Sequence, residues 1–385
     1  MSSPDAIVVG GGLAGLAAAV AVAQAGLSII HVAPKAPPDR RTSALMRPSV
    51  DFLQSTGLIG DPAAIGHPLT QIRIIDATER LIRAPETVFD AAESGLDAFA
   101  WNFPNATLMA AFEAARAQLP GLTAVAAAVT GVRRSAGRWQ VTLADGEELA
   151  CALLVGADGK KSMVRSAAGI HTRERVFAES ALVADLDLGR PLDGASVEFH
   201  YPRGPFTLVP AGGKRANLVW IDSTEVLKQA QASGPESLRT TFLAKSQRLF
   251  GGIALQSPAA VFPLSTLSVA QAGTDGAVLV GEAAHAFPPI GAQGLNLGLR
   301  DVADLAASLA EAERRTPDWA DAVSRDYARR RASDLSRTGT MVDALYRSLL
   351  SGFLPAQALR AAGLWALKLV PPLRRQAFNI GMGVR

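Results

Sequence analysis

A glycine-rich turn near the start of the chain constrains the fold more than any other feature of the sequence. Gly10, Gly12 and Gly15 form a G-x-G-x-x-G pattern. A β-branched run precedes the pattern, and an alanine-rich run that stops at Gly26 follows it. This order predicts a strand, a tight turn, a helix and a second strand over residues 27–32, which is the layout of a dinucleotide-binding βαβ unit.

Each glycine of the pattern has an expected role. Gly10 permits the turn, Gly12 lets the backbone approach a pyrophosphate, and Gly15 lets the helix pack closely on the strand. The N-terminus of the helix would offer free N–H groups and the positive end of its dipole to the phosphates.

The composition argues against several other classes of protein. The chain has 385 residues, of which 49% are hydrophobic and 19% charged, so we expect a soluble enzyme of two domains or more. A net charge of +3 without a basic block argues against nucleic acid. The apolar run at 6–33 has glycines at its front and no basic region before it, which predicts neither a membrane span nor a signal peptide, hence a cytoplasmic protein. The single cysteine, Cys151, is expected in the core, and the scattered histidines predict no metal site.

The order of predicted elements suggests one nucleotide-binding domain with an insertion. Alternating residues predict strands in 69–84 and 180–222, and Asp145-Gly146 predicts a hairpin. A helix is expected over 105–118 with Asn105 as its N-cap, and a second strand-loop-helix unit over 275–310. We therefore expect an α/β fold, with a Rossmann-like domain interrupted by a mainly antiparallel sheet.

Two further motifs follow strand-like runs. Asp158-Gly159 comes after the apolar residues 153–155, where an ordinary Asp-Gly turn would explain it as well. Gly281-Glu282 opens G-E-A-A-H and leads into the glycine-rich P-P-I-G-A-Q-G-L-N-L-G. This pattern predicts a carboxylate and a row of backbone N–H groups at the carboxyl end of a parallel strand, where open α/β sheets bind ligands.

Together, in this order and spacing, the three motifs resemble the class A flavoprotein monooxygenases, the 4-hydroxybenzoate hydroxylase-like group. Within that group the chain looks most like the ubiquinone-biosynthesis hydroxylases, through D-R-R-T-S-A-L at 39–45, G-E-A-A-H, Q-G-L-N-L-G and a basic helical tail. The resemblance implies a discontinuous FAD-binding domain at 1–70, 99–172 and 262–340, a substrate-binding sheet domain at 71–98 and 173–261, and amphipathic C-terminal helices at 341–385.

The resemblance also implies where FAD binds. Its pyrophosphate would lie over the first glycine turn, with Arg41 at the pyrophosphate or ribose unless Arg41 is a solvated loop residue. Asp158 and Gly159 would help hold FAD and a transiently bound NAD(P)H, and Glu282 would accept hydrogen bonds from the ribitol. The isoalloxazine ring would be wrapped by the main chain of a loop that contains Pro289, Gly291, Gln293, Gly294, Leu295 and Asn296.

The reaction follows from the same resemblance. NAD(P)H would reduce FAD, O2 would add to the reduced flavin, and the C4a-hydroperoxide would pass its distal oxygen to an aromatic ring. The loop at Pro289, Gly291 and Gly294 would stabilise the peroxide, and no side chain is expected to act as a catalytic residue. His285 is expected to be structural, and Pro263 would either line the substrate cavity or only end a strand.

The sequence departs from the family pattern at three positions. The acid expected at the end of the second strand is Ala33, the usual aspartate of the third motif is Glu282, and a frequent arginine is replaced by Ala106. These changes put the affinity for the adenosine side of FAD in doubt, but they do not touch the flavin-ring loop.

The tail suggests the substrate class. Residues 345–385 hold six basic residues and no acid, together with Trp365 and several leucines. This pattern suits the anionic inner surface of the cytoplasmic membrane, although a helix packed on the protein's own core would explain it equally well. The basic residues are Arg347, Arg360, Lys368, Arg374, Arg375 and Arg385.

We therefore expect hydroxylation of a polyprenylated phenol or benzoquinol in ubiquinone biosynthesis, with a multi-enzyme complex as a further partner. Two alternatives stay open. One is a flavoenzyme of the same fold acting on another substrate, such as a soluble phenol hydroxylase or a prenyl-lipid reductase. The other is a flavin-binding scaffold with little turnover, an interpretation that Ala33 favours.

Overall fold

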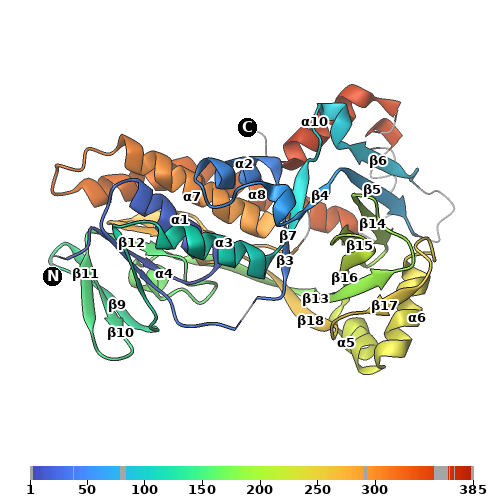
Figure 1. Cartoon of the computed structure of the whole chain (residues 1–385), viewed down its shortest axis with the longest axis horizontal. Coiled ribbons are helices and arrows are strands. Elements are labelled where there is room, and N and C mark those ends of the chain that lie inside the picture. The colour runs from blue at the N-terminus through green and yellow to red at the C-terminus, as the bar shows by residue number, and fades with distance from the viewer. Residues whose placement is uncertain are drawn as a thin grey trace.

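A computed structural model describes residues 3–37, 39–78, 84–289, 293–350, 363, 365–367 and 369–382. Its two principal sheets lie at opposite ends of the molecule, and the long strands β13 (Thr172–Leu188) and β18 (Ala260–Val269) run between them (Figure 1). Parallel strands with helices form one end, and a mainly antiparallel sheet forms the other. The expected α/β fold class is confirmed.

The first sheet brings together strands that are far apart in the sequence. Its central strands β2, β1, β12 and β20 are parallel, so that all of them end at the same edge. In spatial order its strands are β19 (Gly273–Thr274), β20 (Ala277–Leu279), β12 (Leu153–Gly156), β1 (Ala6–Val9), β2 (Ile29–Val32) and β8 (Leu122–Val125).

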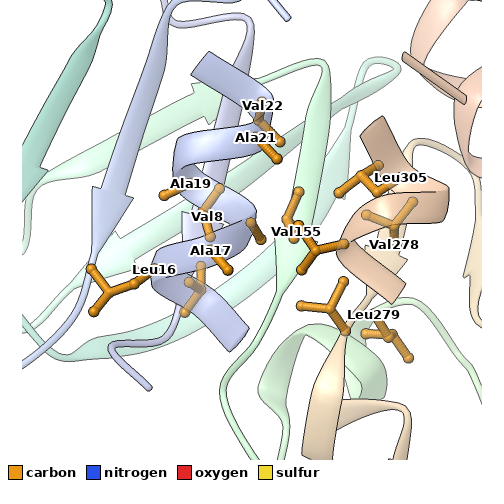
Figure 2. Packing of buried hydrophobic residues seen from close by; sticks show 14 of the residues in the cluster. Val8, Leu16, Ala17, Ala19, Ala21, Val22, Val155, Val278, Leu279 and Leu305 are labelled. Carbon is orange, nitrogen blue, oxygen red and sulfur yellow. The ribbon is translucent and has the colours of Figure 1, made fainter. Parts of the chain in front are cut away.

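Small side chains allow α1 (Leu13–Gln24) to lie in the middle of this domain. Ala17 and Ala19 are fully buried, and α1 packs against α3 (Asn105–Ala117) and α7 (Gln293–Glu311) as well as the sheet. Figure 2 shows Val155 of β12 between α1 and Leu305 of α7. Because α1 is enclosed on several sides, it is apolar almost all round.

The second sheet is covered on its outer face by α5 (Thr224–Ala232) and α6 (Pro235–Lys245). Phe206 and Trp220 of the sheet pack there against Phe242 of α6. Its strand order is β21 (His285–Ala286), β18, β13, β16 (Arg215–Ser223), β15 (Gly204–Pro210), β14 (Ala195–Tyr201), β5 (Gln71–Asp76) and β6 (Thr87–Asp90), with β17 (Ile253–Leu255) paired to β13. All these pairs are antiparallel except β14 with β5.

Two three-stranded sheets complete the strands that the structure describes. One contains the hairpin predicted at Asp145-Gly146, where Gly146 has a φ of +90°. The sheet with the hairpin consists of β9 (Val129–Ser135), β10 (Arg138–Leu143) and β11 (Glu148–Cys151). The other sheet consists of β3 (Thr42–Met46), β7 (Ala100–Pro104) and β4 (His67–Leu69). Cys151 is fully buried as expected, and burial raises the pKa of its thiol to about 12.

The interpretation of Asn105 as an N-cap is wrong. The cap position of α3 belongs to Pro104, and no side chain caps the helix. Asn105 is the first helical residue, and its side chain instead accepts a hydrogen bond from Ser43 and donates one to Asp39. A tertiary role has therefore replaced the local one that the sequence suggested.

A buried ion network joins α7 to the long helix α8 (Trp319–Leu350). Arg331 of α8 is fully buried, and its Nε lies 2.7 Å from Oδ1 of Asp301 on α7. Its Nη1 lies 2.7 Å from carboxylate oxygens of both Asp304 and Asp334. Buried charges are tolerated only when they are paired, so Arg331 compensates the carboxylates around it.

Replacing Arg331 with methionine should lower the free energy of unfolding by about 3–5 kcal/mol, because buried carboxylates lose their counter-charge. Arg330→Met is the matched control, since Arg330 pairs nearer the surface with Asp326 and Glu311. That control should cost about 1 kcal/mol or less. Urea unfolding of both variants measures the difference, and equal losses would contradict the role given to Arg331.

Candidate active site

Backbone contacts bring the ends of β1, α1 and β12 together. Gly10 has a φ of +127°, and a Cβ on it would lie 2.1 Å from the carbonyl oxygen of Ala157, just after β12. A Cβ on Gly15 would lie 2.0 Å from the carbonyl oxygen of Gly10. No side chain fits at either position, so these glycines permit the turn and the close packing that the sequence predicted.

The third glycine of the pattern faces open space. Gly12 is the N-cap of α1, no side chain caps that helix, and a Cβ on Gly12 would meet nothing within 4 Å. The backbone N–H groups of the first turn are therefore accessible to an anion at the positive end of the helix dipole.

His31 supports this turn, and the sequence interpretation missed it. Arg116 donates from Nη1 to Nδ1 of His31 over 3.1 Å, so Nε2 carries the proton that bonds the Gly10 carbonyl oxygen at 2.9 Å. Burial lowers the pKa of the imidazole, which favours this neutral form. A histidine within the apolar strand β2 was the available signal. At the end of β2, Ala33 lies against Gly11.

The Asp158 loop is organised by its own carboxylate. One oxygen of Asp158 accepts the Ser162 hydroxyl at 2.5 Å, and the other accepts the N–H of Met163 at 2.7 Å, the start of α4 (Met163–Ala167). Gly159 makes the turn with a φ of +79°. Asp158 thus shapes the loop, and any contact with a ligand would be additional to these bonds.

Arg165 links this loop to the third motif. Its side chain is buried and donates to the carbonyl oxygens of Lys160, at 2.6 Å, and of Ala283, at 2.9 Å. Ala283 belongs to the short helix η3 (Gly281–Ala283) that follows β20. The sequence interpretation gave Arg165 no role, although it ends the G-A-D-G-K-K-S-M-V-R motif.

Asp301, a buried residue of α7, holds both ends of the third motif, at Gly281 and His285. Its Oδ2 accepts the N–H of Gly281 at 2.8 Å and lies 2.6 Å from Nε2 of His285. His285 is almost fully buried, in keeping with the structural role expected for it. Glu282, between these two anchored residues, is exposed and directs its charge away from the core.

Arg41 lies near Glu282 in a second charged group. Its Nη2 is 2.8 Å from Oδ2 of Asp39, while 70% of its side chain remains exposed. Burial would raise the pKa of Asp39, but hydrogen bonds from Arg41 and Asn105 lower it to about 2. The bond to Asp39 raises the pKa of Arg41, and the charge of Glu282 adds to this shift. Arg41 is therefore a fixed cation with a donor face open to solvent.

The candidate flavin loop ends at a firm anchor. Asn296 is buried. Its Oδ1 accepts hydrogen bonds from the N–H of Met46 at 2.8 Å and from the Ser49 hydroxyl at 2.7 Å. Its Nδ2 donates to the carbonyl oxygen of Ala44 at 2.8 Å. This side chain therefore fixes the loop to β3. Of the other predicted loop residues, Pro289 and Gly294 are exposed, Leu295 is half-buried, Gln293 is buried, and Gly291 lies outside the described residues.

The geometry fits FAD. An open helix N-terminus at the edge of the first sheet suits the pyrophosphate, as does the nearby cation of Arg41, and the exposed carboxylate of Glu282 suits hydroxyl groups. A Cβ on Gly294 would meet nothing within 4 Å, which leaves room beside the loop. Among the described residues, no group of histidine, cysteine, aspartate and glutamate could hold a metal ion.

Comparisons with known proteins agree with this geometry. A family described as "FAD binding domain" matches residues 4–335. Ubiquinone hydroxylase UbiL of Rhodospirillum rubrum is 31% identical, over 98% of this chain and 89% of its own. The 3-demethoxyubiquinol 3-hydroxylase of Escherichia coli is 30% identical, over 98% of each chain.

Solved structures share the fold at lower identity. The p-nitrophenol 4-monooxygenase PnpA of Pseudomonas putida has a TM-score of 0.78 at 18% identity, with 97% of this chain and 96% of that one covered. Klebsiella pneumoniae HpxO, in a complex with FAD and uric acid, has a TM-score of 0.75 at 18% identity, covering 93% and 92%. The family match over most of the chain and the two full-length relatives show that this chain belongs to the FAD-binding monooxygenase family and is an FAD-dependent monooxygenase.

Proposed function

We propose that this monooxygenase hydroxylates the ring of a polyprenylated phenol or benzoquinol intermediate of ubiquinone biosynthesis, with NAD(P)H and O2 as co-substrates. The observation that carries the proposal is the similarity, over 98% of the chain, to two bacterial enzymes whose names give ubiquinone-type substrates. The chemistry that bound FAD supplies is the activation of O2 after its reduction by NAD(P)H.

The charges of the site suggest how this chain holds the cofactor. The first turn of α1 at Gly12 and the guanidinium of Arg41 would attract the pyrophosphate. Glu282 would repel phosphate, so its carboxylate is suited to accept hydrogen bonds from the neutral ribitol hydroxyls. Arg165 and Asp301 would position the Glu282 turn without touching the cofactor.

An apolar cluster lies between the second sheet and β3. Ile72, Ile74 and Val209 of the second sheet and Ala44 and Met46 of β3 all pack against its buried residues, which are Leu69, Phe89, Ala91, Phe99 and Ala100. A reacting ring beside this cluster would be shielded from water, which favours a lipophilic substrate over a small soluble phenol. Leu367 of the tail joins the same cluster, so the tail helps to cover this region.

The tail has two different sides. On one side Leu367 packs inward, and Arg374 is largely buried, with Nη2 2.7 Å from Glu93. Arg374 therefore pairs within the protein, and this side of the tail packs on the protein's own surface. On the other side Trp365, Leu369 and Leu373 are 45%, 69% and 43% exposed.

These exposed side chains form a stripe, because they are spaced four residues apart. Hydrogen bonds from Val370 to Ala366 and from Arg374 to Val370 continue the helical pattern into α10 (Pro371–Met382). Such a stripe suits insertion into a membrane interface, where a polyprenylated substrate resides. No helix among the described residues is long and apolar enough to cross a membrane.

The activity can be tested with a 2-polyprenylphenol in detergent micelles. NAD(P)H oxidation should rise when the phenol is added, O2 uptake should match it, and mass spectrometry should find one added oxygen in the product. Stimulation by small soluble phenols alone would contradict the proposed substrate class. An absence of stimulation by any phenol would contradict aromatic hydroxylation and favour a low-turnover role.

Membrane binding can be tested by replacing Trp365, Leu369 and Leu373 with serine. This triple variant should partition about tenfold or more weakly into liposomes with anionic lipid, because it loses apolar area that the interface would bury. Val176→Ser is the control, since Val176 is 74% exposed on β13. Co-sedimentation measures both variants, and unchanged partitioning of the triple variant would refute a membrane role for the stripe.

A further inference from the structure

The second sheet has an inner face that lies toward the candidate flavin loop. Successive side chains of a strand alternate between faces, and Val197 and Phe199 of β14 pack outward with the α5 and α6 cluster. Glu198 and His200 of β14 therefore lie on the inner face. Their registered neighbours agree with this assignment, since Glu198 is opposite Ile74, which packs against the same buried cluster as Ala44 and Met46 of β3.

Contacts tie this inner face to the flavin loop. Asn217 of β16 accepts a hydrogen bond from Thr42 of β3 at 3.0 Å. The other end of β3 is bonded to the anchor of the loop, because the N–H of Met46 donates to Asn296. One strand thus contacts both the inner face and the anchor of the loop. An aromatic ring that reacts at the flavin would lie on this side of the second sheet.

Glu198 and His200 form a polar pair on this face. Nε2 of His200 lies 3.1 Å from one carboxylate oxygen of Glu198, and the side chains are 11% and 28% exposed, respectively. Across the sheet Glu198 is opposite Ile74 and Thr207, and Thr207 is opposite Val219. His200 satisfies one oxygen of this partly buried carboxylate, and the other oxygen can accept a hydrogen bond from a ligand.

Two neighbouring carboxylates on the inner face are occupied by other groups. Asp76 accepts hydrogen bonds from the N–H and hydroxyl of Thr78 and from the N–H of Ala84. Asp185 accepts one from the amide of Asn217 at 2.7 Å. Glu198 differs from both, because among the described residues its second oxygen has no hydrogen-bond partner.

We propose that Glu198 binds the hydroxyl group of the phenolic substrate and acts as its general base, with His200 as the residue that positions the carboxylate. The inference rests on the proposed function, because it needs a phenol as substrate. It assigns a side-chain role at a site where the sequence suggested none.

The proposed step is a proton transfer. The O–H bond of the phenol breaks, the proton moves to the free oxygen of Glu198, and the electron pair stays on the phenolate oxygen. This raises the electron density of the ring at the carbon that is to be hydroxylated. His200 donates from Nε2 to the other carboxylate oxygen, which fixes the orientation of Glu198 before and after the transfer.

The experiment uses the FAD-loaded enzyme and 2-prenyl-4-nitrophenol, whose phenol and phenolate forms differ in visible absorption. The wild-type protein should bind the probe and increase its ionised fraction. Glu198→Gln should retain its FAD yet bind the probe mainly as neutral phenol, and it should hydroxylate a 2-polyprenylphenol about 100-fold or more slowly. Glu236→Gln is the matched control, because Glu236 is an exposed carboxylate on α6, which covers the outer face.

His200 supplies a second comparison. His200→Ala should lower the ionised fraction of the bound probe, and His200→Gln, which can still donate to Glu198, should restore part of it. If Glu198→Gln ionises and hydroxylates like the wild type, the inference is wrong while the proposed function stands. If the wild-type enzyme neither binds the probe nor hydroxylates the prenylated phenol, the proposed function fails, and the inference fails with it.

Discussion

The structure depends on a backbone contact at the end of the first strand. Gly10 and Gly15 have no room for a side chain, and their absent Cβ atoms let α1, β1 and the loop after β12 touch. His31 completes the contact by donating to the Gly10 carbonyl oxygen. Because these segments meet, the open first turn at Gly12 lies beside the motifs that follow β12 and β20. Without this contact, three parts of the chain that are distant in sequence would not share one site.

Charged side chains then set the positions of the other motifs. Arg165 links the Asp158 loop to the turn after β20 by a hydrogen bond to the Ala283 carbonyl oxygen. Asp301 of α7 accepts a hydrogen bond from the N–H of Gly281 in the same turn. Arg331 compensates Asp301 and couples this arrangement to α8. Gly12, Arg41 and Glu282, which are proposed to meet FAD, are thus exposed. The residues that position these motifs, Arg165, Asp301 and Arg331, are buried. This separation explains how a site made of loops can be well defined.

The sequence was sufficient for features that a short segment dictates. The glycine turn, the helix that follows it and the hairpin at Asp145-Gly146 each depend on a few neighbouring residues, and the structure has them. Features that arise from tertiary contacts were missed or misread. Asn105 suggested a cap but bonds Asp39, and the pairing of Arg374 with Glu93 could not be predicted from the sequence of the tail. The pair formed by Glu198 and His200 gains meaning only once the alternation of β14 is placed against β3.

We expect the open first turn of α1 to receive the pyrophosphate of FAD, and a titration of FAD-free protein with FAD measures this contact. Gly12→Val fits the backbone there, with a φ of −75°, but would fill the open space. Gly60→Val is the control, because a Cβ on Gly60 also meets nothing within 4 Å. We expect Gly12→Val to weaken FAD binding about tenfold or more. Its free energy of unfolding should change by about 1–2 kcal/mol at most. If Gly12→Val bound FAD as tightly as the wild type, the first turn of α1 would not be the pyrophosphate site.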